Sequence, residues 1–328
     1  MILPLLATSG LTLLLYMSGF FVIFTPLPLI FTSLRKGLAL AVAAFFLSLF
    51  GLAAFYRVPM IPSSFLPMAA LQPGMAPDQI AGLGLIYFFY YTSIGFGIVF
   101  TAQKSLSLEK SIGTILLAAL VIPGVLLAIF SIRSNLHLVG RLQAGIQGLL
   151  ENRIPLQGSS GQSGVNPEEG VFLKQYAGPI AFYMTRMMPA LIINLTLTII
   201  SLNIYLLKRW MPSWKPFPGW ADFSLWKISE RTIWLPIAVG TVFFLNLYLF
   251  QKPWLDLVLT NALIVTACLY FFQGISILSF MVRRKIPPFF RIFTYLLILF
   301  FMQIVGGVLV ILGLFDFWFD FRKLRKVN

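Results

Sequence analysis

The sequence has very little of the side-chain chemistry that metal sites and disulfides require. Its 328 residues include one cysteine, Cys268, and one histidine, His137. A single cysteine excludes an intrachain disulfide, and one cysteine with one histidine cannot form a metal site of the common Cys and His types. We therefore expect no bound metal and no cofactor.

Charged side chains are also scarce. They make up 10% of the residues, against 59% hydrophobic residues, whereas a soluble domain is about 25% charged. This much apolar surface requires the lipid bilayer as its solvent. The net charge of +14 comes from short basic clusters beside apolar runs, which is typical of loops that face anionic lipid headgroups. Because no nucleic-acid recognition motif accompanies this charge, we expect the bilayer and not nucleic acid as the partner.

Catalytic motifs are absent as well. The sequence contains no Gly-x-Ser-x-Gly elbow, no His-Glu-x-x-His helix and no paired acids within an apolar run, although a membrane enzyme needs a nucleophile or an acid–base pair at bilayer depth. Asp256 and Asp316 lie at the ends of apolar runs, and we interpret both as interfacial and not buried. We therefore expect that the protein is not an enzyme.

Long apolar runs are what the sequence does have. A helix needs roughly 20 residues to cross a bilayer, and backbone groups in lipid must be hydrogen-bonded within their own segment. The pattern therefore predicts an all-α, polytopic transmembrane bundle of about eight spans, within a range of seven to nine. The expected spans are 2–24, 38–56, 80–102, 111–132, 187–207, 233–250, 254–281 and 290–315.

Two prolines interrupt the first apolar run. Pro26 and Pro28 remove backbone donors and restrict the residues before them, so the helix from about Ile2 to Phe24 is expected to break there. Residues 25–34 then form a re-entrant half-helix buried in protein, or they belong to one long, tilted and kinked helix. The sequence leaves both alternatives open.

A polar insert at 133–186 separates an N-terminal membrane half, 1–132, from a C-terminal half, 187–328, which ends in a basic tail. Apolar residues at spacings of three and four predict an interfacial amphipathic helix from Leu136 to Leu150. The Gly- and Ser-rich stretch at 157–166 is expected to be a flexible linker, and it lacks the Gly-Lys-Ser/Thr ending of a phosphate loop. Pro179 and Pro189 argue against a continuous straight helix after it.

Amide side chains mark the candidate binding residues. Amides within a span are costly in hydrocarbon and usually face the bundle interior. We consider a speculative substrate site formed by Asn203, Asn246, Asn261 and Gln273, with Arg186 as the counter-charge for an anionic group. The alternative is that each amide joins one pair of helices.

The C-terminal half carries short motifs at Phe272–Ser276, Ser279–Arg291 and Gly313–Lys323, and Arg186 and Pro189 open the fifth expected span as Arg-x-x-Pro. In these motifs the chain resembles the YybS-like family of uncharacterised bacterial multi-pass membrane proteins. The resemblance implies a multi-pass protein of the bacterial inner membrane. That family is more remotely similar to the substrate-binding subunits of energy-coupling-factor vitamin transporters and to a rod-shape membrane protein.

Two functions follow from this resemblance. The first is a small-molecule binding or transport subunit, whose energy must come from other membrane subunits because the chain has no nucleotide-binding motif. The alternative is a structural or assembly protein of the cell envelope without transport activity. The extra spans and the polar insert depart from the transporter subunits.

Overall fold

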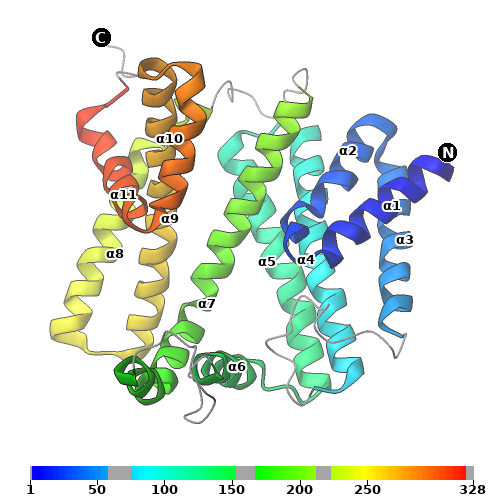
Figure 1. Ribbon diagram of the computed structural model, residues 1–328, viewed down its shortest axis with the longest axis horizontal. Helices are drawn as coiled ribbons and strands as arrows, with labels where there is room; N and C mark the ends of the chain where they lie inside the picture. Colours follow the sequence, from blue (N-terminus) through cyan, green and yellow to red (C-terminus); the bar gives the residue numbers. More distant parts are fainter. Residues whose placement is uncertain (1, 58–74, 153–166, 212–222, 323–328) are drawn as a thin grey trace. The chain divides into compact units, whose positions relative to one another are not determined.

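The computed structural model describes residues 2–57, 75–152, 167–211 and 223–322. Every regular element in these ranges is helical (Figure 1), which confirms the expected all-α class. The expected flexible linker at 157–166 lies outside the described residues.

Seven helices of the described residues are long and apolar enough to cross a membrane. They are α3 (Leu38–Tyr56), α4 (Pro77–Gln103), α5 (Leu108–Arg133), α7 (Pro167–Trp210), α8 (Trp234–Leu245) with the short turns that flank it, α9 (Pro253–Lys285) and α11 (Met302–Phe319). Two shorter apolar helices, α1 (Ile2–Met17) and α10 (Pro288–Phe300), accompany them.

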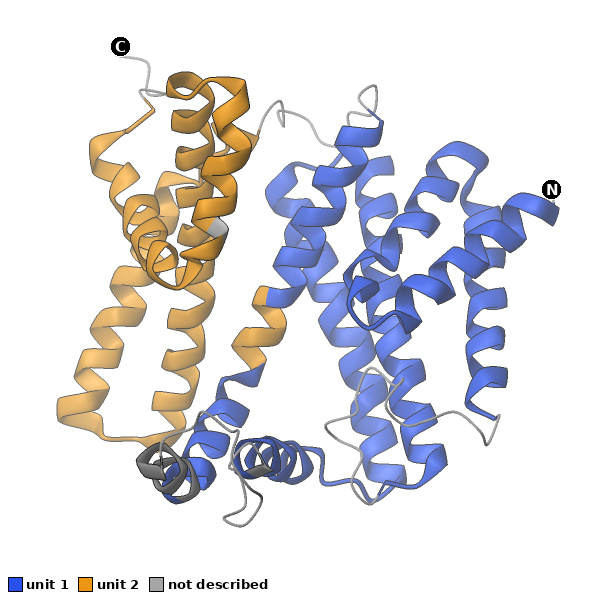
Figure 2. Cartoon of the chain, viewed as in Figure 1, with its two compact units in different colours: residues 1–188, 195–218 blue, residues 189–194, 219–328 orange. Residues whose placement is uncertain are grey.

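The chain forms two compact units (Figure 2). Unit 1 comprises residues 1–188 and 195–218, and unit 2 comprises residues 189–194 and 219–328, so α7 contributes to both. The contacts place residues 133–188 with the N-terminal unit, and the three-part division expected from the sequence stays a prediction.

In unit 1, the first apolar run forms two helices. α1 ends at Met17, earlier than the expected end at Phe24, because the chain turns at Gly19, whose φ of +68° suits glycine. A 3-10 turn, η1 (Phe21–Phe24), leads into α2 (Pro26–Lys36). With 11 residues, α2 is too short to cross a bilayer; it packs against α1, α3 and α4 and is mostly buried. Whether it is re-entrant in a membrane stays a prediction.

The polar insert contributes α6 (Leu138–Asn152), which forms where the apolar spacing predicts an amphipathic helix. In Figure 1 it is seen nearly end-on while α4 and α5 run along the picture, so it lies crosswise to them. Its place at a membrane surface stays a prediction. The next helix, α7, runs without interruption for 44 residues, although Pro179 and Pro189 argued for a break.

In unit 2, the eighth expected span is not one helix. The chain turns at Phe301 between α10 and α11. The prediction of one continuous helix at 290–315 is therefore wrong. No proline or glycine stands at this turn to mark it in the sequence. The two successive apolar helices therefore look like one long apolar run. α11 then packs along α9.

The contact between α9 and α11 depends on glycine. A Cβ added to Gly313 would collide with the backbone carbonyl of Tyr270, and a Cβ on Gly274 would collide with that of Leu309. The two backbones therefore approach more closely than any larger residue allows, which is typical of helix pairs in membranes.

We expect Gly313→Ala to destabilise unit 2 by about 1–3 kcal/mol, because the clash with a backbone carbonyl forces the two helices apart. The midpoint of thermal denaturation of the purified protein in detergent measures this loss. Gly306→Ala is the matched control in the same helix, since a Cβ at Gly306 meets no atom within 4 Å. Equal midpoints for the two variants would contradict the close packing described here.

Candidate functional site

Asn203 fixes α7 to the break between η1 and α2. Its side chain is 0% exposed, and its Nδ2 donates to the carbonyl oxygens of Ile23, at 2.9 Å, and Ile199, at 2.7 Å. Both partners are carbonyl acceptors, so the nitrogen of the amide, and not its oxygen, must face them. The Oδ1 atom of Asn203 and the Oγ1 atom of Thr25, a residue of the break, are both buried without a hydrogen-bond partner.

An open apolar groove of about 680 Å³ lies beside this break in unit 1. Phe24 lines it from η1, and Phe31 and Arg35 line it from α2; Phe31 and Arg35 are four residues apart, which places them on one face of α2. Leu206 and Trp210 line it from α7, one and two turns beyond Asn203. Residues of α1 complete the wall.

Arg35 is the charged side chain among the residues that line the groove. Its guanidinium carbon lies 4.4 Å from the centre of the Phe31 ring, and within the described ranges it forms no ion pair. Lys36 follows it at the end of α2, and Lys208 and Arg209 precede Trp210 at the end of α7. The groove therefore combines apolar walls with a cationic end.

In unit 2, two of the amides stabilise local structure. Asn246 lies at the start of the π-helical turn η6 (Asn246–Phe250); it donates to the carboxylate of Asp256 and the carbonyl of Lys252 and accepts from the Lys252 N–H. Asn261 accepts from the N–H of Ala190 at 2.9 Å and donates to the Leu257 carbonyl at 2.8 Å. Asn261 thus bonds the backbone of α7 directly after Pro189.

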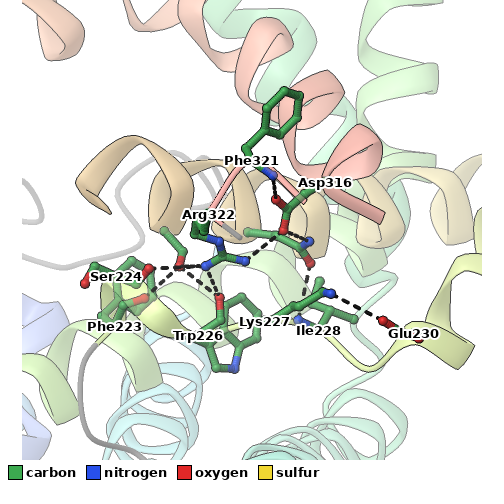
Figure 3. Close-up of polar contacts among 11 residues, drawn as sticks. Phe223, Ser224, Trp226, Lys227, Ile228, Glu230, Asp316, Phe321 and Arg322 are labelled. Atoms are coloured by element: carbon green, nitrogen blue, oxygen red, sulfur yellow. Dashed lines mark hydrogen bonds and ion pairs between the residues drawn. The ribbon is translucent and has the colours of Figure 1, made fainter. Parts of the chain in front are cut away.

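Gln273 belongs to a buried polar cluster that we call the C-terminal clasp, formed by Gln273, Ser276, Asp316 and Arg322 (Figure 3). Its Nε2 donates to Asp316 Oδ2 at 3.1 Å, and its Oε1 accepts from the Ile228 N–H at 3.3 Å. Asp316 Oδ2 also accepts from Arg322 Nη2 at 2.8 Å, with both side chains 0% exposed.

The remaining bonds of the C-terminal clasp reach the segment before α8. Arg322 Nη1 donates to the carbonyls of Ser224 and Trp226 and to Ser276 Oγ, and the Phe321 N–H donates to Asp316 Oδ1 (Figure 3). The Asp316 carboxylate thus accepts from three donors and is enclosed by protein. These bonds connect α9, α11 and residues 223–228. Asp316 and Arg322 therefore form a structural ion pair.

The residues of the speculative site are distributed over different contacts. Asn203 lies in unit 1 at the helix break, and Asn246, Asn261 and Gln273 lie in unit 2. Asn261 and Gln273 are 12 residues apart on α9, about 18 Å along the helix axis, so the structure does not bring these two together. Arg186 is exposed, and its guanidinium carbon lies 4.0 Å from the centre of the Phe182 ring. Substrate binding by this set stays a prediction.

Sequence reasoning missed the ion pair of the C-terminal clasp. The interpretation of Asp316 as interfacial and not buried is wrong, and Arg322 is not part of an exposed basic tail, since its exposed fraction is 3%. The chain reverses at Asp320, which takes a φ of +38°, and this turn brings Arg322 back to Asp316. An acidic residue at the end of an apolar helix with an arginine six residues later was the available signal.

Replacing Asp316 with leucine is expected to cost about 3–5 kcal/mol, because it leaves the Arg322 guanidinium buried without its counter-charge. Adding Arg322→Leu to that variant should restore part of the loss. Denaturant titration of the detergent-solubilised protein measures the free energy of unfolding for the two single variants and the double variant.

Glu230→Gln is the control for this cycle. It removes the ion pair between the half-buried Lys227 and the exposed Glu230, whose N–O distance is 3.4 Å, and a surface pair contributes at most about 1 kcal/mol. Additive losses from the two clasp variants would show that Asp316 and Arg322 do not depend on each other.

Comparison with known proteins gives one family. Neither the search of curated proteins nor the search of solved structures returned a match. A family model described as predicted membrane protein (DUF2232) matches residues 5–317, which cover almost the whole chain and both units. The chain therefore belongs to this family of predicted membrane proteins, DUF2232.

Proposed function

We propose that this chain is a small-molecule binding or transport subunit of the bacterial inner membrane, whose ligand is an amphiphile with an anionic headgroup and an apolar tail. The observation that carries the proposal is the groove of unit 1, with apolar walls and Arg35 at its cationic end. The resemblance to the YybS-like family, and its remote similarity to energy-coupling-factor substrate-binding subunits, supports the same class of function.

The charges at the groove favour an anionic amphiphile over a neutral one. Lys36 follows Arg35 at the end of α2, and Lys208 and Arg209 directly precede the groove residue Trp210 at the end of α7. Trp210 lines the groove as Arg35 does, and tryptophan prefers the depth of lipid headgroups. A phosphate or carboxylate at Arg35 therefore places an apolar tail along Phe31 and Leu206.

The form of the groove fits a ligand site of this kind. A volume of about 680 Å³ lies within the range of roughly 300–1,000 Å³ for small-molecule sites. Irregular backbone at membrane depth is tolerated where it is buried in protein or lines a cavity, and discontinuous helices form the substrate sites of many transporters. The break at η1 and its neighbour α2 border this groove. For a role in transport, the proposal includes a partner subunit that supplies the energy.

The test measures lipid selectivity at Trp210 in the full-length protein, reconstituted in nanodiscs. Brominated phosphatidylglycerol and brominated phosphatidylcholine serve as quenchers, and the signal of Trp210 is the difference between the wild type and Trp210→Phe. We expect stronger quenching by the anionic lipid. Arg35→Gln should reduce this preference roughly fivefold, because one cation near a membrane surface contributes about 1 kcal/mol.

Lys104→Gln provides the matched control. Lys104 is an exposed cation of unit 1 that does not line the groove, and its removal changes the net charge by the same amount. The control variant should keep the preference for phosphatidylglycerol. Equal quenching by the two lipids in the wild type would count against an anionic amphiphile and leave the structural or assembly role as the better proposal.

A further inference from the structure

The break between η1 and α2 collects oxygen atoms that lack hydrogen-bond donors. Thr25 and Asn203 are each 0% exposed, and neither Thr25 Oγ1 nor Asn203 Oδ1 has a partner. Asn203 reaches the break, because its Nδ2 donates to the carbonyl of Ile23, two residues before Thr25. Buried acceptors without a partner cost free energy, so such atoms indicate an unseen partner.

Proline increases this excess of acceptors. Pro26 and Pro28 have no N–H, so neither can donate to the carbonyl four residues earlier, on Val22 or Phe24. The Val22 carbonyl accepts from the Thr25 N–H at 3.0 Å, whereas the position four residues after Phe24 is occupied by Pro28. The same prolines remove two of the donors at the start of α2, which weakens the positive end of this helix.

These oxygens suit a monovalent metal cation. Hard cations take oxygen ligands, and broken helices in membrane transporters coordinate Na⁺ through unwound carbonyls and half-helix ends. The described oxygens of the break belong to a hydroxyl, an amide and backbone carbonyls. Divalent cations are usually held by carboxylates, and the described residues contain no cluster of three acidic, histidine or cysteine side chains.

We propose that the break between η1 and α2 is a site for a monovalent metal cation of the Na⁺ type, with Asn203 Oδ1, Thr25 Oγ1 and the carbonyl oxygen of Phe24 as ligands. The site lies within unit 1 and uses two side-chain oxygens that have no hydrogen-bond partner, together with a carbonyl whose usual donor position is occupied by Pro28. It does not depend on the amphiphile proposed for the groove, since that headgroup is placed at Arg35, which is not one of the three ligands.

The first experiment measures the midpoint of thermal denaturation of the full-length protein in detergent, with NaCl, KCl, MgCl₂ or choline chloride at equal ionic strength. Choline is too large for a buried site and sets the reference. We expect a saturable rise of about 2–5 °C with Na⁺ or K⁺, because a ligand that binds only the folded state stabilises it. MgCl₂ should give no saturable rise.

Thr25→Val removes one ligand oxygen while it keeps the shape of the side chain, and it should abolish the rise or shift its half-saturation at least tenfold. Thr92→Val is the matched control, because Thr92 is equally buried in α4 and its hydroxyl donates to carbonyls of its own helix. The control variant should keep the response to the cation.

Equilibrium binding of radioactive ²²Na⁺ to the wild-type protein tests the proposal without a variant, so that it stands even if Thr25→Val does not fold. We expect one site per chain, with competition by unlabelled Na⁺ and none by choline. If ²²Na⁺ does not bind and the four salts give equal midpoints, the unpaired oxygens hold water only and the proposal is overturned. A rise with MgCl₂ alone would overturn it as well.

Discussion

Hydrocarbon offers no hydrogen bonds, and this constraint determines how the helices of this chain meet. Each backbone group that leaves a helical ladder must find a partner within the protein. A side chain can also bond a carbonyl within a helix, as the Tyr16 hydroxyl does when it donates to the Gly84 carbonyl of α4 at 2.6 Å. Asn261 bonds the backbone beside Pro189, and Asn203 bonds the carbonyl of Ile23. The amides thus bond backbone groups that lie beside a proline or a turn.

The two units differ in how their buried polar atoms are hydrogen-bonded. In unit 2, the C-terminal clasp pairs a buried carboxylate with an arginine, an amide and a backbone N–H, so its charge is well compensated. In unit 1, the helix break leaves the oxygens of Thr25 and Asn203 unpaired. The Nε atom of Arg322 in the clasp is also buried without a partner, but the carboxylate there accepts from three donors, whereas neither oxygen at the break accepts from any.

Local sequence predicts the helices of this chain well, because apolar length and proline positions act within one segment. The spans at α3, α4, α5 and α9 are expected from their apolar runs, and the break near Pro26 is expected from the loss of backbone donors. The turn at Phe301 has no such signal, since phenylalanine, leucine and methionine surround it. What decides that turn is the packing of α11 on α9 through Gly313, a tertiary contact.

At the candidate sites, too, sequence reasoning does not predict features that depend on tertiary contacts. Sequence reasoning selected Asn203 because an amide within an apolar run usually faces the interior of the bundle, and Asn203 is buried. It missed the ion pair of Asp316 and Arg322, because that pair requires the reversal of the chain at Asp320. It also missed the groove, since a groove arises only when faces of α1, α2 and α7 meet.

The C-terminal clasp also bears on how the protein is made. Gln273 and its partner Asp316 are 43 residues apart, so a ribosome delivers α9 to the membrane well before α11 follows. During that interval the amide of Gln273 lacks its acidic partner, and Gly274 presents a bare backbone surface to lipid. The contact between α9 and α11 and the bond from Gln273 to Asp316 therefore form only after α11 has been synthesised.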